Sequence, residues 1–354
     1  MKLIRFFLFP FAFLYRQIMW FRNLLYDKGI FKSTSFDIPV IAVGNLNMGG
    51  TGKSPQVEYL IRLLQSDKKL AVLSRGYKRK TNGFVLINET HSALDVGDEP
   101  LQFFKKFSDI DVAVDANRVN GIKRLQKEVH PDIILLDDAF QHRKVKADFY
   151  ILLTKYGDLF TDDYVLPRGN LRESRKGAKR ADLIIVTKCP KDLSFEMKEN
   201  IKRRIGKYSE KPIFFSGITY DKETKGTTRV SETELKNHEL IVITGIANPR
   251  SFLDHLKAKD CKFEHFNYPD HHNFSKEDIR QIKNAYGGLQ SIEKILLTTE
   301  KDYMRLSEHV PELSYLEIKS DFLSGKGDFD KAIFELVFGS LQKLSKDLSD
   351  NKKK

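Results

Sequence analysis

A lysine and a serine that directly follow a run of glycines are the residues of this chain best suited to phosphate chemistry. The run reads Gly49-Gly50-Thr51-Gly52-Lys53-Ser54. Glycines let the backbone turn tightly and direct successive N–H groups at phosphate oxygens. Lys53 is expected to reach the β- and γ-phosphates of a nucleotide, and the Ser54 hydroxyl is expected to face Mg²⁺. The pattern therefore predicts a nucleotide-binding loop.

This loop departs at one position from the usual G-x-x-x-x-G-K-[ST] pattern, because Asn47 stands where the first glycine is expected. The flanking sequence still fits a phosphate loop: residues 38–43 form a short apolar run typical of a buried strand, and apolar residues at helical spacing follow Ser54. A glycine-rich turn before a helix is the alternative. We predict that the nucleotide is bound by Asn47, Met48, Gly49, Gly50, Thr51, Gly52, Lys53 and Ser54.

Two carboxylates at the end of another apolar run are candidate magnesium ligands. Residues 133–136 read IILL and are followed by Asp137 and Asp138. A carboxylate at a strand end beside a phosphate loop can hold Mg²⁺ directly or through water. Paired acids can also simply cap a loop. We predict a metal site formed by Ser54, Asp137 and Asp138, and the sequence leaves open which aspartate contacts the ion.

The apolar run at 183–186 bears on the identity of the nucleotide. It leads into Thr187-Lys188-Cys189-Pro190, which is similar to the N/T-K-x-D motif of GTP-binding proteins. Pro190 replaces the aspartate that would pair with guanine. We therefore expect ATP rather than GTP.

The apolar runs that must position these residues alternate with helical stretches through the first part of the chain. The expected strands are 38–43, 70–73, 111–114, 133–136, 149–153 and 183–186. This alternation predicts an α/β fold with a P-loop NTPase-like parallel sheet flanked by helices and with ligand loops at the strand C-termini. Runs at 240–243 and 295–298 predict a second, smaller α/β domain. The expected division is an N-terminal membrane-surface helix at 1–30, a P-loop core at 31–215, a linker at 216–235, the smaller domain at 236–340 and a disordered charged tail at 341–354.

The N-terminal segment combines bulky apolar side chains with basic ones. Residues 6–15 read FFLFPFAFLY, a run shorter than the roughly 20 apolar residues that span a bilayer. No small-x-small cleavage site follows, which disfavours a secretory signal. A membrane-surface helix fits better, with Trp20 at the interface and Arg16 and Arg22 at anionic headgroups. A core helix that covers the sheet is the alternative.

The formal net charge of +12 favours anionic partners, but it does not choose among nucleic acid, anionic lipid and phosphorylated substrates. The lysines at 352–354 are expected to form a frayed, solvated end, so no nucleic-acid partner is predicted. Cys189 and Cys261 form no metal-ligand pair and suggest no disulfide framework.

Several further motifs follow one another in a fixed order. They are Leu73-Ser74-Arg75-Gly76-Tyr77, Gly97-Asp98-Glu99-Pro100, Val114-Asp115-Ala116-Asn117-Arg118, the stretch 166–173, Gly245-Ile246-Ala247-Asn248-Pro249, Asp270-His271-His272-Asn273-Phe274 and Thr299-Glu300-Lys301-Asp302. Each is weak alone, but the ordered set resembles the tetraacyldisaccharide 4'-kinase family of the P-loop NTPase superfamily, from the N-terminal segment to about residue 337. Departures are small: Ser54 stands where threonine is frequent, and Pro55 ends the loop.

This resemblance implies a substrate and a location. Family members use Mg-ATP to phosphorylate the 4'-hydroxyl of the lipid A disaccharide 1-phosphate, which gives lipid IVA. They work at the cytoplasmic face of the inner membrane of Gram-negative bacteria, so a peripheral or monotopic protein on an anionic inner-membrane surface is expected.

The resemblance also implies a catalytic carboxylate–histidine pair, here Asp98 and His271. A positioned base accepts the proton of a sugar hydroxyl as the bond to phosphorus forms. From the residues alone, a helix N-cap is favoured for Asp98, and a loop polar cluster or weak metal site is favoured for His271. If the two meet, one comes from each domain and closure assembles the site. Candidates for gripping the substrate's phosphate or the transferring phosphoryl group are Arg75, Arg118, Arg168 and Arg172.

Two other functions are weighed against this one. A partition- or metallochaperone-type P-loop ATPase also uses a Gly-Gly-x-Gly-Lys-Ser/Thr loop, but it gives no reason for the apolar N-terminal segment. A nucleotide-gated membrane scaffold would not need Lys53, Ser54 and Asp137 together. Turnover that depends on lipid separates the three hypotheses.

Overall fold

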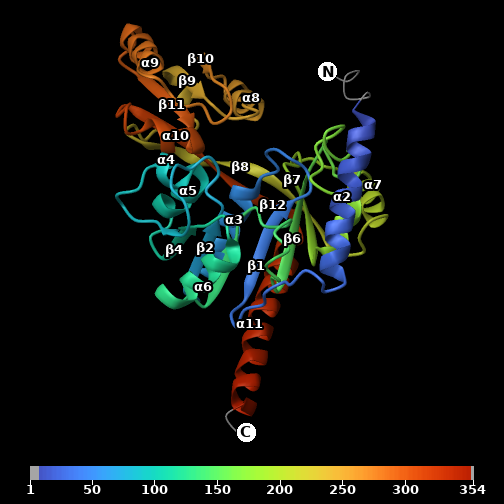
Figure 1. Cartoon of the computed structure of the whole chain (residues 1–354). Helices are drawn as coiled ribbons and strands as arrows, with labels where there is room; N and C mark the ends of the chain where they lie inside the picture. The colour runs from blue at the N-terminus through green and yellow to red at the C-terminus, as the bar shows by residue number, and fades with distance from the viewer. Residues whose placement is uncertain (1–7, 352–354) are drawn as a thin grey trace.

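The strands of the described part of the chain join one mixed sheet (Figure 1). The computed structural model describes residues 8–351, apart from the side chains of residue 338 and residues 340–351. Residues 1–7 of the predicted surface helix and residues 352–354 of the predicted tail lie outside this part. The strand order is β10-β9-β11-β12-β8-β7-β6-β1-β5-β2-β4-β3.

The phosphate-loop half of the sheet is parallel, as predicted. β1 lies between β5 and β6, and both pairings are parallel. The two-residue edge strand β3 is antiparallel to β4. The strands of this half are β1 (Val40–Asn45), β2 (Leu70–Ser74), β3 (Val85–Leu86), β4 (Ile110–Val114), β5 (Ile133–Leu136), β6 (Phe149–Lys155) and β7 (Leu183–Thr187).

Helices cover both faces of this half because alternate strand residues point to opposite sides. Ile41 and Val43 of β1 pack with α3 and α5, whereas Val40 and Ala42 pack with α6. A third cluster joins α2 and α7 to β6 and β7. The helices are α2 (Phe9–Asp27), α3 (Lys53–Leu64), α4 (Ala93–Val96), α5 (Asp98–Lys106), α6 (Arg118–Glu128), the 3₁₀ helix η1 (Arg175–Arg180) and α7 (Phe195–Gly206).

The second half is a smaller parallel α/β unit, which agrees with the predicted fold class. β9 pairs in parallel with β10 on one side and β11 on the other. Its elements are the 3₁₀ helix η2 (Leu235–Asn237), β9 (Glu239–Thr244), α8 (Arg250–Ala258), β10 (Phe263–Asn267), α9 (Lys276–Gly288), β11 (Lys294–Thr299) and α10 (Glu300–Leu306).

Two long antiparallel strands connect the halves, β8 (Ile213–Gly226) and β12 (Leu313–Ser324). β8 also pairs with β7, and β12 also pairs with β11, so the sheet is continuous. The segment predicted as a linker, 216–235, thus begins within β8. The proposed domain boundaries stay a prediction.

The last helix, α11 (Lys326–Asn351), leaves β12 and returns to the phosphate-loop half. Phe329, Ile333 and Val337 are buried in the cluster that includes β1 and α3. The helix continues through residues 341–351, which we predicted to be part of a disordered tail. Leucines at 341, 344 and 348 keep the helical apolar spacing there, and this signal was outweighed in the prediction by the charged residues. Within residues 8–351 no helix combines the length and apolar character needed to cross a bilayer.

Gly44 of β1 is a site where an added methyl group is expected to destabilise the fold. A Cβ at this position would lie 2.7 Å from Cβ and 2.9 Å from the backbone nitrogen of the fully buried Phe140. Overpacking of this kind costs about 1–3 kcal/mol, so Gly44→Ala should lower the free energy of unfolding in urea by that amount. Gly327→Ala is the control, because that Cβ meets no atom within 4 Å. Equal stability of the two variants would contradict the packing argument.

Candidate functional site

The glycine-rich loop lies between β1 and α3, at the C-terminal end of a central strand. Gly49 and Gly52 have φ angles of 109° and 81°, which glycine adopts without the strain of a side chain. The Thr51 hydroxyl accepts a hydrogen bond of 2.8 Å from the Asn45 amide, and the Thr51 carbonyl accepts one of 2.7 Å from the Thr187 hydroxyl. These bonds anchor the loop to the ends of β1 and β7.

Asn47, the departure from the usual loop pattern, is held by its own contacts. Its backbone forms an antiparallel bridge with Leu171, and its side-chain amide donates a 3.3 Å hydrogen bond to Asp163. The next residue, Met48, is exposed, and its backbone N–H donates to the carbonyl of Asn170 at 2.7 Å. The basic stretch around 166–173 therefore braces the loop.

Lys53 and Arg172 both lie on the carboxylate of Asp138. The Lys53 Nζ is 3.8 Å from Asp138 Oδ1, and the two guanidinium Nη atoms of Arg172 reach the two carboxylate oxygens at 2.9 and 3.1 Å. Burial alone would raise the pKa of Asp138, but Lys53 and Arg172 hold it below its usual value. Asp138 is therefore an ionised group that is already paired with two cations.

Asp137 has a different environment. It is buried, and its Oδ2 accepts a 2.7 Å hydrogen bond from the Ser74 hydroxyl. Its Oδ1 is buried and has no hydrogen-bond partner in the described part of the chain. Burial, together with the nearby carboxylates of Glu99 and Asp138, raises the pKa of Asp137 to about 7. An unpaired buried carboxylate oxygen is costly unless a cation or a water molecule satisfies it.

The four predicted arginines are placed differently. Arg118 is buried beneath the site and donates to the backbone carbonyl of Asp137 at 3.3 Å, and burial lowers its pKa to about 10. Arg75 is exposed after β2. Arg168 stacks on Tyr164, with its guanidinium carbon 3.8 Å from the ring centroid. Arg172 and Arg118 are thus the two that contact the strand-end aspartates.

Asp98 and His271 meet, although 173 positions separate them. His271 Nδ1 lies 2.8 Å from Asp98 Oδ2. Asp98 begins α5 in the first half, whereas His271 follows β10 in the second half with a φ of 56°. Arg305 of α10 lies 2.8 Å from the same Asp98 oxygen. Burial alone would raise the pKa of Asp98, but His271 and Arg305 hold it below its usual value.

A chain of polar contacts connects this pair to the phosphate loop. The Ser54 hydroxyl donates to Glu99 at 3.2 Å, and Lys301 Nζ lies 3.4 Å from the same carboxylate oxygen. Lys301 Nζ is also 3.3 Å from His271 Nε2. The loop that can hold phosphates and the pair that can hold a hydroxyl proton therefore belong to one site.

From the sequence, no role was assigned to three residues of this site, Glu99, Lys301 and Arg305, although the motifs that contain Glu99 and Lys301 were identified. Glu99 is next to Asp98, and Lys301 lies in the quoted Thr299–Asp302 motif. Their adjacency to assigned residues was the available signal. Arg305 had no local signal, because it reaches Asp98 only through the tertiary fold.

Lys188 is a further residue that the sequence analysis did not assign to the site. Its Nζ would lie 3.8 Å from a Cβ at Gly50, so its amino group overlies the glycine loop. Burial, and then the positive charges of Lys155 and Lys53, lower its pKa. A cation held among other cations beside a glycine loop favours an anionic ligand there.

Taken together, the geometry suits transfer of a phosphoryl group to a hydroxyl. The loop offers backbone N–H groups and lysines for phosphates, the carboxylate of Asp137 offers an oxygen for a hard cation, and Asp98 with His271 offers a proton acceptor.

Comparisons with known proteins found a matching family model, similar sequences and a similar solved structure. A family model described as tetraacyldisaccharide-1-P 4'-kinase matches residues 4–337. A tetraacyldisaccharide 4'-kinase of Flavobacterium johnsoniae is 52% identical over 346 residues, which cover 97% of this chain and 100% of that protein. One of Bacteroides thetaiotaomicron is 43% identical, with 87% and 84% covered. The crystal structure of LpxK from Aquifex aeolicus in complex with ATP is similar with a TM-score of 0.77 and 32% identity, and the match covers 94% of this chain and 99% of that one.

Proposed function

The chain belongs to the tetraacyldisaccharide-1-P 4'-kinase family, and from this premise we propose that it transfers the γ-phosphoryl group of ATP to the 4'-hydroxyl of tetraacyldisaccharide 1-phosphate. The product is lipid IVA, and the enzyme is a kinase of lipid A biosynthesis. The observation that carries the proposal is the chain of contacts from Ser54 through Glu99 and Lys301 to His271 and Asp98.

ATP is the phosphoryl donor, and the glycine loop is its expected binding site. Backbone N–H groups of residues 49–54 and the N-terminus of α3 present partial positive charge to the phosphates. Lys53 adds a full charge at the first residue of that helix. These groups position the phosphates and stabilise their negative charge, which are the main contributions of a protein to phosphoryl transfer.

Mg²⁺ fits the donors beside the loop. Asp137 has a buried oxygen without a partner, and the crowding of Glu99, Asp137 and Asp138 raises the pKa of one of them. We assign Asp137 and the Ser54 hydroxyl to the ion, with Asp138 next to them and held by Arg172. When bound, Mg²⁺ neutralises charge on the transferring phosphate.

Asp98 and His271 are the proposed catalytic pair. Both contacts described for Asp98, from His271 and from Arg305, go to Oδ2. Within residues 8–351 no hydrogen bond reaches its Oδ1, which is therefore the oxygen open to the substrate hydroxyl. The carboxylate is ionised at neutral pH because its pKa is depressed, so it can accept that hydrogen bond. His271 fixes the carboxylate orientation and can share the proton.

The remaining arginines are proposed as anion-gripping groups with unequal roles. Arg172 holds Asp138 with a fork of two hydrogen bonds, and it can turn one of them to a phosphate. Arg118 supports the backbone beneath Asp137. Arg75, which is exposed, and Arg168, which stacks on Tyr164, are the arginines that we propose bind the phosphate of the lipid substrate.

The helix α2 is proposed to rest on an anionic membrane. Ala12 is its one buried residue, and the Tyr15 hydroxyl donates to the backbone carbonyl of Arg172 at 2.7 Å, so one side of the helix is fixed to the protein. The other side exposes Phe9, Phe11, Phe13, Leu14, Ile18, Trp20 and Phe21. Such an aromatic surface with basic neighbours suits the headgroup region of a bilayer. We place the enzyme, as a peripheral or monotopic protein, at the cytoplasmic face of the inner membrane of a Gram-negative bacterium.

Removing two of these aromatic side chains should weaken membrane binding. Phe11 and Trp20 are 63% and 57% exposed, so Phe11→Ser/Trp20→Ser should fold normally. Burial of each ring contributes about 1.5–3 kcal/mol, and sedimentation with phosphatidylglycerol-containing vesicles should fall at least about tenfold. Ile292→Ser is the control, since this side chain is fully exposed in the second half. Unchanged sedimentation of the double variant would contradict the proposed surface.

The proposed reaction is tested by phosphoryl transfer from radiolabelled ATP to tetraacyldisaccharide 1-phosphate in mixed micelles. Label should appear in the lipid, and it should not appear when the acceptor already carries a 4'-phosphate. ATP hydrolysis without labelled lipid would instead favour the partition-type ATPase.

A further inference from the structure

Three buried carboxylates contact one buried lysine and two partly exposed cations where the two halves of the chain meet. The carboxylates come from α3, α10 and β12, and the cations come from α3, α5 and β8. The members are Glu58, Glu300, Glu317, Arg62, Lys106 and Lys225. We call this group the junction cluster.

Lys106 occupies the centre of the junction cluster. Its Nζ lies 2.6 Å from Glu58, 2.9 Å from Glu300 and 2.6 Å from Glu317, and each of these side chains is at most 9% exposed. Burial alone would lower the pKa of Lys106, but Glu58 and Glu300 hold it above its usual value. The ammonium group stays charged and lies among three carboxylates whose oxygens are close enough together to share one cation.

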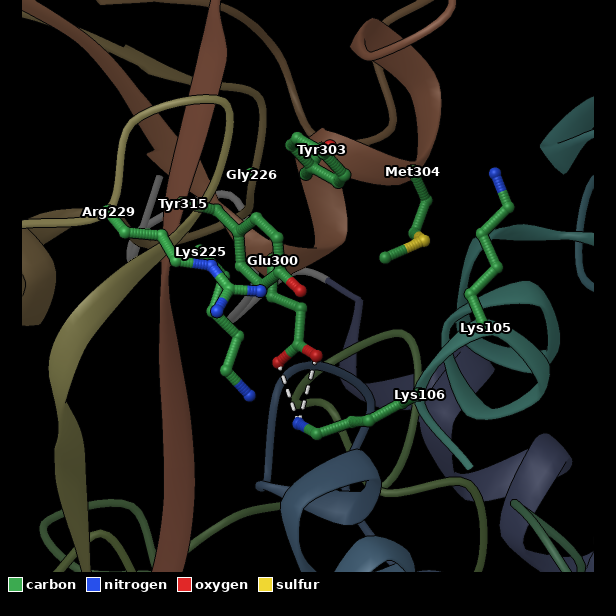
Figure 2. Close-up of a pocket in the computed structure, with 9 residues that line it drawn as sticks. All are labelled: Lys105, Lys106, Lys225, Gly226, Arg229, Glu300, Tyr303, Met304 and Tyr315. Atoms are coloured by element: carbon green, nitrogen blue, oxygen red, sulfur yellow. Dashed lines mark hydrogen bonds and ion pairs between the residues drawn. The ribbon is translucent and has the colours of Figure 1, made fainter. Parts of the chain in front are cut away.

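Figure 2 shows the side chains from the cavity that opens onto the cluster, with Lys106 directed at the carboxylate of Glu300. The cavity has a volume of about 240 Å³. Lys105, the preceding residue of α5, lines the same cavity but points away from Glu300. In the described part of the chain no carboxylate pairs with Lys105, which makes it a matched control for Lys106.

The two helices joined by Lys106 and Glu300 are the helices that carry the proposed catalytic groups. Lys106 is the last residue of α5, and Asp98 is its first. Glu300 is the first residue of α10, which also carries Lys301 and Arg305. Ion pairs between these helices therefore fix both ends of α5. Asp98 with Arg305 and Glu99 with Lys301 lie at its start, and Lys106 with Glu300 lies at its end.

We propose that Lys106 and Glu300 are positioning residues, which hold α5 against α10 so that Asp98 meets Arg305 and His271 in the reactive arrangement. The inference rests on the proposed catalytic role of Asp98 and His271. Neither residue of the Lys106–Glu300 pair contacts Asp98 or the phosphate loop in the described structure, so the effect is transmitted through the two short helices. A small displacement of a reacting group is enough to slow catalysis substantially.

The test uses a charge-balanced double variant, Lys106→Met/Glu300→Gln. Lys106→Met alone leaves three buried carboxylates with two cations and can prevent folding, whereas the double variant leaves two of each. We expect kcat to fall about 10- to 100-fold, while the KM for ATP stays within about twofold. Lys105→Met should match the wild type, and circular dichroism with a thermal melt verifies that each variant is folded.

A second background separates positioning from a general structural defect. If the pair acts through Asp98, adding Lys106→Met/Glu300→Gln to Asp98→Asn should cost less than about a further twofold in single-turnover rate. A full additional loss in that background would overturn the inference, and so would an unchanged kcat in the folded double variant. Full activity of Asp98→Asn alone would refute the catalytic pair itself, which is a different result.

A second substitution covers the case in which the double variant does not fold. Lys106→Arg keeps the charge, but the longer, planar guanidinium cannot keep three contacts shorter than 3 Å. It is compared with Lys105→Arg, and an unchanged kcat in both variants would overturn the positioning role.

Discussion

Replacement of Lys53 by alanine is expected to abolish measurable lipid phosphorylation. Lys53 is the first residue of α3, its side chain is largely buried, and its Nζ lies 3.8 Å from Asp138 Oδ1. Loss of one preorganised group that stabilises developing charge costs about 10²- to 10³-fold in kcat, and loss of a full charge at the phosphates should lie at or above that range. ATP affinity should fall as well, because the same charge contacts ground-state phosphates.

The measurement for Lys53→Ala is label transfer to the lipid, together with ATP binding by equilibrium titration. Lys123→Ala, an exposed lysine on α6, is the control and should retain full activity. Removal of Lys53 also leaves Asp138 paired with Arg172 alone. Retention of more than about a tenth of the wild-type rate would be incompatible with a phosphate-binding role for Lys53.

Asp98→Asn is the second substitution with a large expected effect. Asparagine keeps the shape but cannot accept a proton, and it removes the charge that orients His271. General-base catalysis contributes about 10²- to 10⁴-fold, so kcat should fall by that factor. ATP affinity should be retained, because Asp98 has no contact with residues 49–54 in the described structure. A variant that binds ATP but keeps the wild-type kcat would exclude Asp98 as the base.

The same substitution has a pH-dependent effect on stability. The pKa of Asp98 is depressed in the folded protein, so its contribution is present above the unfolded value of about 3.9 and is lost as pH falls through the folded value. At pH 7, Asp98→Asn leaves Arg305 without its nearest carboxylate, which costs about 1–3 kcal/mol. The difference in thermal stability from the wild type should be largest near neutral pH and should shrink at low pH.

The features that could be predicted from the sequence are those encoded by neighbouring residues. The glycine loop, the strand before it and the helix after it are contiguous in the sequence. The spacing of their apolar residues and their residue types were therefore enough to predict all three. Asp137 and Asp138 were found in the same way, at the end of an apolar run. Their different environments were not predictable, because Ser74 and Arg172, which distinguish them, come from separate strands and loops.

The prediction that Asp98 and His271 form a catalytic pair depended on the family resemblance rather than on local pattern. Asp98 reads as a helix N-cap, and nothing near His271 in the sequence indicates a partner 173 positions away. The continuity of the sheet was also missed. Residues 216–226 were predicted to be linker because charged residues and threonines interrupt the apolar pattern there, yet they form a strand because β12 pairs with them.

The return of α11 to the first half has a consequence for how the chain is made. Phe329, Ile333 and Val337 fill the core behind β1 and α3, and Phe322 of β12 joins them. During synthesis, every residue of the second half leaves the ribosome before these side chains do. Until then, one apolar face of the nucleotide-binding half is uncovered. The unit made of β9, β10 and β11 can already fold at this stage, so the half that is synthesised later can complete its core first. We therefore expect the ATP site to become stable only after α11 has been made, and a chain truncated after β12 to expose that apolar face to proteases.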